Sequence, residues 1–432
     1  YATEAEDRMN CIASLNVCIL LLCTACGAPA SESLVPEDPM SYRIDYQVDA
    51  TRTDGTISVA MKLSQARALL REMTMRPDSR ISKLEADGTL ESRGDSVSWL
   101  PPATGGTIRW DVDVAHRRNG DGYDAWLGAN WGLFRAEDII PRASTRTLKG
   151  SRSETWLTLA LPRGWSAITQ YFKDDGAIRI DNPQRRFDQP TGWMVIGNLG
   201  VRRDMIAGTR VAVAGPVDSG VRRVDTLALL NWTLPELARV VPDLPRRLTI
   251  VSAGDPMWRG GLSAPQSLYV HADRPLISEN GTSTLLHEVM HLTLALSAAK
   301  GYDWIVEGMA EYYSLELLHR SGTISDSRYA LAKARLADWA DSAATLCRTS
   351  STGATTALAV RTFSALDKEI RNLSDGEANF DDVVRRLTGI GDDVDLILLN
   401  DTVTQLTGSK SDVLHIDKLP GCRNIAVADR ET

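Results

Sequence analysis

Apolar and polar residues alternate along several stretches of the chain between residue 41 and about residue 205. These stretches, which are rich in Val, Ile, Trp and Thr, are residues 42–50, 56–63, 107–115, 154–161 and 192–201. Such alternation is typical of half-buried β-strands, because successive side chains of a strand point to opposite faces. Turn-forming sequences rich in Gly, Asp and Asn separate the stretches. We therefore predict a β-sandwich-like domain over residues 41–205.

The pattern changes at about residue 206. Short apolar runs at 210–215, 246–253 and 267–272 predict strands, whereas residues 224–241 have the three- and four-residue apolar spacing of a helix. The remaining sequence is mostly helical in pattern. We therefore predict a small mixed sheet followed by helices for residues 206–432, and a multidomain α+β protein as a whole.

One of the predicted helices, over residues 282–296, contains the sequence His-Glu-Val-Met-His at 287–291. Residues four apart lie on the same face of a helix, so His287 and His291 can bind one Zn²⁺ ion through their imidazoles. Glu288 lies beside the first histidine, where it can take a proton from a metal-bound water and make that water a nucleophile. This H-E-x-x-H pattern predicts a zinc hydrolase.

A third metal ligand is available in the next predicted helix, which runs from Trp304 to Leu318. A hairpin of these two helices would bring Glu307 back to the two histidines. Three protein ligands with one open position are the usual arrangement for catalytic zinc. Glu311 lies one turn after Glu307 and can accept a hydrogen bond from the free ring N–H of a ligand histidine.

These motifs resemble those of the gluzincin metallopeptidases. The sequence is most similar to the M61 glycyl aminopeptidase family and more distantly to the M1 aminopeptidases, which carry H-E-x-x-H and a later W-x-x-E-G-[FM]-x-x-Y segment, here at 304–312. The resemblance covers roughly residues 205–400. It implies a thermolysin-like catalytic domain after a β-domain, with one zinc per chain. It also implies that His287, His291 and Glu307 are the ligands and Glu288 the general base.

The sequence departs from that family pattern near the substrate. Gly260, Gly261, Leu262 and Ser263 occupy the place of a Gly-rich edge strand that binds substrate backbone in the relatives. In many relatives an acidic residue ends this strand, but here Ser263 is followed by Ala264. Many relatives also carry a Tyr that can stabilise the oxyanion, and residues 356–363 contain none. This chain therefore departs from the family mechanism in two parts. These are the recognition of a free substrate N-terminus and the group that stabilises the oxyanion together with the zinc.

The sequence leaves three functions open. The first is an exported zinc-dependent peptidase that hydrolyses peptides or proteins. The second is a catalytically inactive, peptidase-like binding module at the cell surface, and the third is a zinc hydrolase of non-peptide amides. His271, at the end of the predicted strand at 267–272, either lines the cleft or has a structural role.

The N-terminal region predicts export. An apolar core at about 12–22 is too short to span a bilayer as a stable helix but suits a signal sequence. The following segment resembles a bacterial lipoprotein processing site with Cys26 as the lipidated residue, which would attach the protein to a membrane. An ordinary cleaved signal peptide and a short anchor are the alternatives. We therefore expect a targeting segment at 1–26, a linker at 27–40, and a location in the bacterial periplasm or cell envelope.

The 432 residues carry a net charge of −8, which argues against nucleic acid as a partner.

The remaining cysteines agree with an exported location. Beyond Cys26 only Cys347 and Cys422 remain, and in an oxidising compartment they can form one disulfide.

Overall fold

The computed structural model describes residues 36, 38–52, 54–118, 122–171, 173–174, 176–182 and 187–423. Residues Val35–Thr432 form one compact unit. The expected targeting segment at 1–26, including Cys26, and most of the expected linker at 27–40 lie outside the described residues. Among the helices that are described, none is long and apolar enough to cross a membrane.

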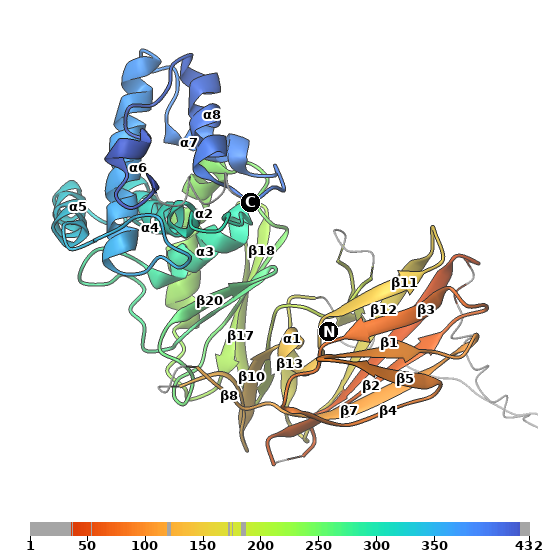
Figure 1. Ribbon diagram of the computed structural model, residues 1–432. Helices are drawn as coiled ribbons and strands as arrows, with labels where there is room; N and C mark the ends of the chain where they lie inside the picture. The colour runs from red at the N-terminus through yellow and green to blue at the C-terminus, as the bar shows by residue number, and fades with distance from the viewer. Residues whose placement is uncertain are drawn as a thin grey trace, which may run out of the picture. The chain divides into compact units, whose positions relative to one another are not determined.

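Four sheets are present in the described part of the chain (Figure 1), and each is named here after one of its strands. The seven-stranded β1 sheet has the order β14 (Lys173–Asp174), β15 (Ala177–Ile180), β12 (Arg152–Ala160), β1 (Ser41–Asp49), β2 (Thr56–Ser64), β7 (Gly105–Asp113) and β4 (Ile81–Ala86). The β3 sheet has the order β11 (Ala143–Thr147), β3 (Leu70–Met75), β6 (Ser96–Leu100) and β5 (Thr89–Arg93). Every alternating stretch foreseen from the sequence contains one of the observed strands.

The β16 sheet connects the β-rich region to the rest of the chain. Its order is β13 (Ser166–Ile168), β16 (Trp193–Gly197), β10 (Trp131–Arg135), β9 (Tyr123–Leu127) and β8 (His116–Arg117). Met194 and Ile196 belong to the core shared with the β1 and β3 sheets, whereas Trp193 and Val195 pack against Tyr269 on the other side. Strand β16 is buried on both faces, which explains its continuous apolar sequence.

The β19 sheet is mixed and carries the helices. Its order is β17 (Leu199–Ile206), β18 (Thr209–Pro216), β19 (Arg247–Val251), β21 (Ser267–Val270) and β20 (Gly261–Ala264). Strands β18, β19 and β21 are parallel, and β20 is an antiparallel strand at the edge. Strand β17 pairs over its whole length with β18. This sheet therefore begins at Leu199, seven residues before the boundary expected at 206.

Helices cover one face of the β19 sheet (Figure 1), where the largest apolar core lies. The helices are α1 (Ala136–Ile139), α2 (Arg223–Val240), α3 (Thr284–Leu294), α4 (Asp303–Arg320), α5 (Asp326–Ala340), α6 (Ala354–Leu373), α7 (Phe380–Leu387) and α8 (Leu396–Thr407), and a short 3₁₀ turn follows at Ile416–Lys418. All except α1 come after β18, as the helical pattern of the second half predicts. Cys347 and Cys422 are joined by a disulfide that ties the segment before α6 to the C-terminal region.

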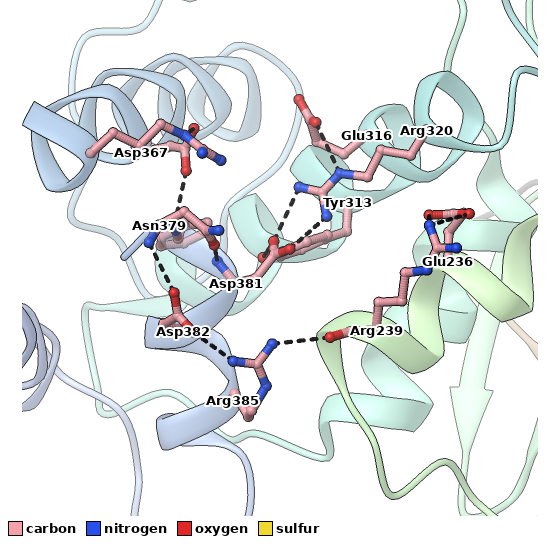
Figure 2. A network of polar contacts seen from close by, with 12 residues as sticks. Glu236, Arg239, Tyr313, Glu316, Arg320, Asp367, Asn379, Asp381, Asp382 and Arg385 are labelled. Atoms are coloured by element: carbon pink, nitrogen blue, oxygen red, sulfur yellow. Dashed lines mark hydrogen bonds and ion pairs between the residues drawn. The ribbon is translucent and has the colours of Figure 1, made fainter. Parts of the chain in front are cut away.

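A polar network holds the C-terminal end of α4 (Figure 2). Arg320 donates two hydrogen bonds to the carboxylate of Asp381 at 2.7 and 3.1 Å, and the Tyr313 hydroxyl donates to the same carboxylate at 2.8 Å. Asn379 caps α7 by accepting from the Asp381 backbone N–H at 2.8 Å. Because these side chains are only partly exposed, the bidentate pair fixes α4 relative to α7.

Candidate metal centre and hydrolytic site

Helix α3 carries two histidines and begins where the sequence predicts. Ser283 caps it by accepting a hydrogen bond from the backbone N–H of Leu286 at 3.3 Å. Ser283 is also joined to Ser314 of α4, whose hydroxyl oxygen accepts from the Ser283 N–H at 3.0 Å. Apolar residues of α3 are buried against the core, so His287 and His291 project together from the opposite stripe. The cap and the α4 contact fix the start and axial position of the helix.

The second helix brings a carboxylate to the histidines. The Nε2 atoms of His287 and His291 are 3.0 Å apart. The Glu307 carboxylate oxygens lie 3.4 Å from the first of these nitrogens and 3.3 Å from the second. Ligands held at zinc–ligand bond lengths around a tetrahedral ion are separated by about 3.3 Å. The donor set and its spacing therefore fit a zinc ion, and His287, His291 and Glu307 form the one such cluster found among the described residues.

Glu311 fixes the orientation of one of these rings. Its carboxylate lies 3.0 Å from Nδ1 of His287. Since a carboxylate accepts hydrogen bonds, Nδ1 of His287 donates to Glu311, and Nε2 is the ring atom that faces Glu307 and is left for a metal ion. Glu307 and Glu311 are four residues apart on α4, so one helix face supplies both carboxylates.

The charges in this cluster favour a bound cation. Burial lowers the pKa of His287, but hydrogen bonds to Glu307 and Glu311 outweigh it and raise the pKa to about 10. Burial raises the pKa of Glu307, but the hydrogen bonds from His287 and His291 lower it to about 2. The two carboxylates thus create a negative potential that would stabilise a metal ion in place of protons.

Glu288 is placed differently from the three clustered residues. It is only 8% exposed, and burial raises the pKa of its carboxyl group. The nearby His287 and His291 side chains partly counter that increase, and the Ser263 side chain adds a smaller effect. A Cβ atom at Gly261 would lie 2.8 Å from Cγ of Glu288, so glycine permits the close approach of α3 to strand β20. The edge strand and the carboxylate are therefore in direct contact.

The edge strand leaves part of its backbone available. The His271 N–H donates to the Gly260 carbonyl at 3.0 Å. Because backbone groups of an antiparallel pair point alternately toward and away from the partner, those of Gly261 and Ser263 point away from β21. Leu262 lies between them, and its carbonyl accepts from the Trp193 indole at 3.0 Å.

A cavity of about 500 Å³ adjoins this strand and the metal cluster. His291 and Leu292 line one side, and the turn from Ser263 to Gln266 lines another. Gln170, Asn182 and Thr191, from the β-rich region, line the remaining side. The cavity is thus large enough for several side-chain-sized groups beside the candidate centre.

Residues 356–363, where the family resemblance suggested a Tyr, belong to α6 and have a packing role. Ala359 and Phe363 of α6 contact α4 beside Gly308, where an added Cβ would lie 2.4 Å from Cβ of Ala359. His271 is buried at the end of β21 and is not part of the cluster.

Asp303 is a further carboxylate near Glu307 that the sequence motifs did not point to. It lies four residues before Glu307, and burial raises the pKa of its carboxyl group. Its carboxylate accepts from the Ser351 N–H at 2.6 Å. The helical spacing to Glu307 is the sequence signal that could have identified it.

Known proteins resemble this chain in three-dimensional structure, whereas the sequence comparisons found no match. No protein-family model matches the chain, and no curated protein sequence matches it. An aminopeptidase N family protein from Idiomarina loihiensis is similar with a TM-score of 0.59 and 16% identity, over 88% of this chain and 74% of that protein. Yeast leukotriene A4 hydrolase in complex with bestatin gives a TM-score of 0.54 and 16% identity, over 88% and 67% of the two chains. Native leukotriene A4 hydrolase from Saccharomyces cerevisiae gives 0.50 and 14%, over 86% and 66%. At these identities the likeness establishes a shared α+β fold of several sheets and helices.

Proposed function

We propose that this protein is a zinc-dependent peptidase. The observation that carries the proposal is the convergence of His287, His291 and Glu307, whose ligand atoms all lie within 4.8 Å of one another. The likeness in fold to an aminopeptidase N family protein and to leukotriene A4 hydrolase supports it. The motifs at 287–291 and 304–312 also support the finer proposal of an M61-like gluzincin.

In this proposal zinc, when bound, supplies a Lewis acid that polarises the scissile carbonyl and makes water more acidic. His287, His291 and Glu307 hold the ion, and Glu311 keeps the Nε2 lone pair of His287 directed toward it. Glu288 takes a proton from the attacking water and passes it to the leaving amine. Its burial raises its pKa, which makes the carboxylate a better base than an exposed one.

The substrate would be an extended peptide. Gly261 and Ser263 can pair with its backbone through the N–H and C=O groups that point away from β21, as in β-strand addition. The cavity next to His291 would receive side chains on one side of the scissile bond.

The test combines metal analysis with a peptide library. The zinc-loaded protein should contain one zinc per chain and cleave peptides. Glu288→Gln should keep the zinc and lower kcat by about 10²–10⁴-fold, which is the usual contribution of a general base. His287→Ala should lose the zinc.

Each alternative function has its own outcome. One zinc per chain without cleavage of any peptide or amide supports the binding module, and cleavage of non-peptide amides alone supports the third function. A wild-type protein that stays empty in excess zinc contradicts the metal centre itself.

We also propose that the protein is exported and that Cys26 is lipidated. The apolar core at about 12–22 and the Cys26 junction support this proposal, as does the disulfide between Cys347 and Cys422, which suits an oxidising compartment. Expression in a bacterium followed by fractionation should place the wild type in the membrane fraction and Cys26→Ser outside it. Recovery of the intact precursor from the cytoplasm would contradict export.

A further inference from the structure

A second cavity, also of about 500 Å³, lies on the face of the β19 sheet that is opposite to the helices. Residues alternate along the strands that form its floor. Val211 and Val213 of β18 belong to the core under the helices, so Arg210 and Ala212 face the other way. We call this cavity the arginine pocket, because Arg203, Arg210 and Arg247 line it.

The three arginines come from three neighbouring strands. Arg210 of β18 lies directly beside Arg247 of β19 in the parallel register. Arg203 of β17 lies opposite Ala212 of β18, one position further along the same face. Arg203 and Arg210 are exposed at the rim, whereas Arg247 is 9% exposed. The side-chain positions that would form an apolar core elsewhere in this sheet are thus occupied by guanidinium groups.

Arg247 is held in a defined position. It donates to Asp181 at 3.0 Å and to the Gln266 side-chain oxygen at 3.0 Å. Its guanidinium also lies over the ring of Tyr171, 5.7 Å from the centroid. These contacts preorganise the charge, so a ligand would not have to order it.

The other wall of the arginine pocket is apolar. Trp165, Ala167 and Ile178 line it, together with Leu159 and Leu161. Among the described residues that line the pocket, none is Asp or Glu. A wall of this kind beside three guanidinium groups suits a carboxylate carried on an aliphatic or extended group.

The arginine pocket adjoins the cavity beside the metal cluster. Gln170 lines both cavities. Gln266 lines the cavity next to His291 and accepts the hydrogen bond from Arg247. A peptide that follows strand β20 past Ser263 toward Gln266 would therefore approach the arginine pocket.

We infer that the arginine pocket binds an acidic side chain of the substrate peptide, at a position remote from the scissile bond. This inference rests on the proposed peptidase function and specifies its substrate class as acidic peptides. Arg247 fixes the floor of the site, and Arg203 and Arg210 supply the long-range attraction at its rim.

The test measures binding separately from hydrolysis. Two fluorescently labelled peptides are compared that differ only in having Glu or Gln at the same positions, and fluorescence anisotropy gives their Kd values. The full chain carries Glu288→Gln and is loaded with zinc, so the peptides remain intact. The variant Arg203→Gln/Arg210→Gln removes the rim charges. Arg202→Gln is the matched control, because Arg202 precedes Arg203 on the same strand and is not part of the pocket lining.

We expect the Glu peptide to bind about 10-fold more tightly than the Gln peptide, which is the factor that two partly solvated ion pairs can supply. The double variant should lose this preference, and Arg202→Gln should retain it. Both rim arginines are exposed, so the fold should survive, and an unchanged circular dichroism spectrum checks this. Arg203→Glu/Arg210→Glu should reverse the preference toward a Lys peptide.

Equal Kd values for the two peptides, or a preference that survives the double variant, would overturn the inference. Hydrolysis of the same two peptides by the wild-type protein then distinguishes a wrong pocket assignment from a wrong peptidase proposal. Equal kcat/KM for both peptides leaves the peptidase intact and removes the acidic preference. Tight, arginine-dependent binding without hydrolysis leaves the pocket intact and removes the peptidase.

Discussion

Gly308, the residue after Glu307 on α4, allows the closest helix contact beside the metal cluster. A Cβ atom at this position would lie 2.4 Å from Cβ of Ala359 and 2.8 Å from Cε2 of Phe363, both on α6. Carbon atoms in favourable contact are about 3.5–4.0 Å apart. Gly308→Ala therefore requires α4 and α6 to separate by about 1 Å.

Two opposing effects decide the stability of this variant. Alanine in place of glycine inside a helix stabilises it by about 1 kcal/mol. Overpacking a filled core costs about 1–3 kcal/mol, and so short a contact belongs at the upper end of that range. We expect a net loss of about 1–2 kcal/mol in the free energy of unfolding. We also expect weaker zinc binding, because Glu307 moves with α4.

Urea denaturation followed by circular dichroism measures the effect, and a double-mutant cycle with Ala359→Gly assigns it. The second change alone should cost about 2 kcal/mol, from helix propensity and one buried methyl group. The double variant should be more stable than the sum of the single changes predicts, by about 1–3 kcal/mol. A Gly308→Ala protein that is about 1 kcal/mol more stable than wild type would show the gain in helix propensity alone. That result would mean that the added methyl group does not clash with α6, and it would refute the packing argument.

Three further changes test the site and the cross-link. Glu311→Gln should weaken zinc binding by about 10–100-fold in competition with a chelator, and unchanged affinity would mean that the ring of His287 does not depend on this carboxylate. Gly261→Ala should keep one zinc per chain but lower kcat, because the new Cβ displaces Glu288; full activity would contradict the contact. Replacing Cys347 and Cys422 by Ser opens a link between residues 75 positions apart and should cost about 2–4 kcal/mol in urea denaturation, whereas two free thiols in the oxidised wild type would contradict the bridge.

The cluster of His287, His291 and Glu307 could be predicted from the sequence because its signals are local. The spacing of His287 and His291 needs only a helix, and Glu307 needs only a hairpin that returns along it. Apolar residues recur at helical spacing in both segments, and the helices form close to the predicted residues. The strands were accessible for the same reason, since the alternation along β1 or β12 is visible without knowledge of their partners.

Features that depend on pairing between distant segments could not be predicted from the sequence. Strand β17 has mostly exposed side chains, so its sequence does not reveal that it joins β18 rather than the β-rich region. The arginine pocket depends on the β18–β19 register, which places Arg210 beside Arg247. A shift of one residue would turn these side chains to the opposite face, and no local pattern specifies the register. The contact of Gly261 with Glu288 likewise requires the packing of α3 on β20.

The two helices that carry the candidate ligands are held by contacts of different kinds along their length. Ser283 and Ser314 join α3 to α4 near the N-terminal end of α3. Gly308 lets α6 press against α4 beside Glu307, and Arg320 anchors the far end of α4 to Asp381 (Figure 2). A metal site tolerates only small errors in ligand position, so its accuracy must come from such surrounding contacts. The small residues at 308 and 359 therefore help to set the geometry of the candidate metal site, although they contribute no chemistry.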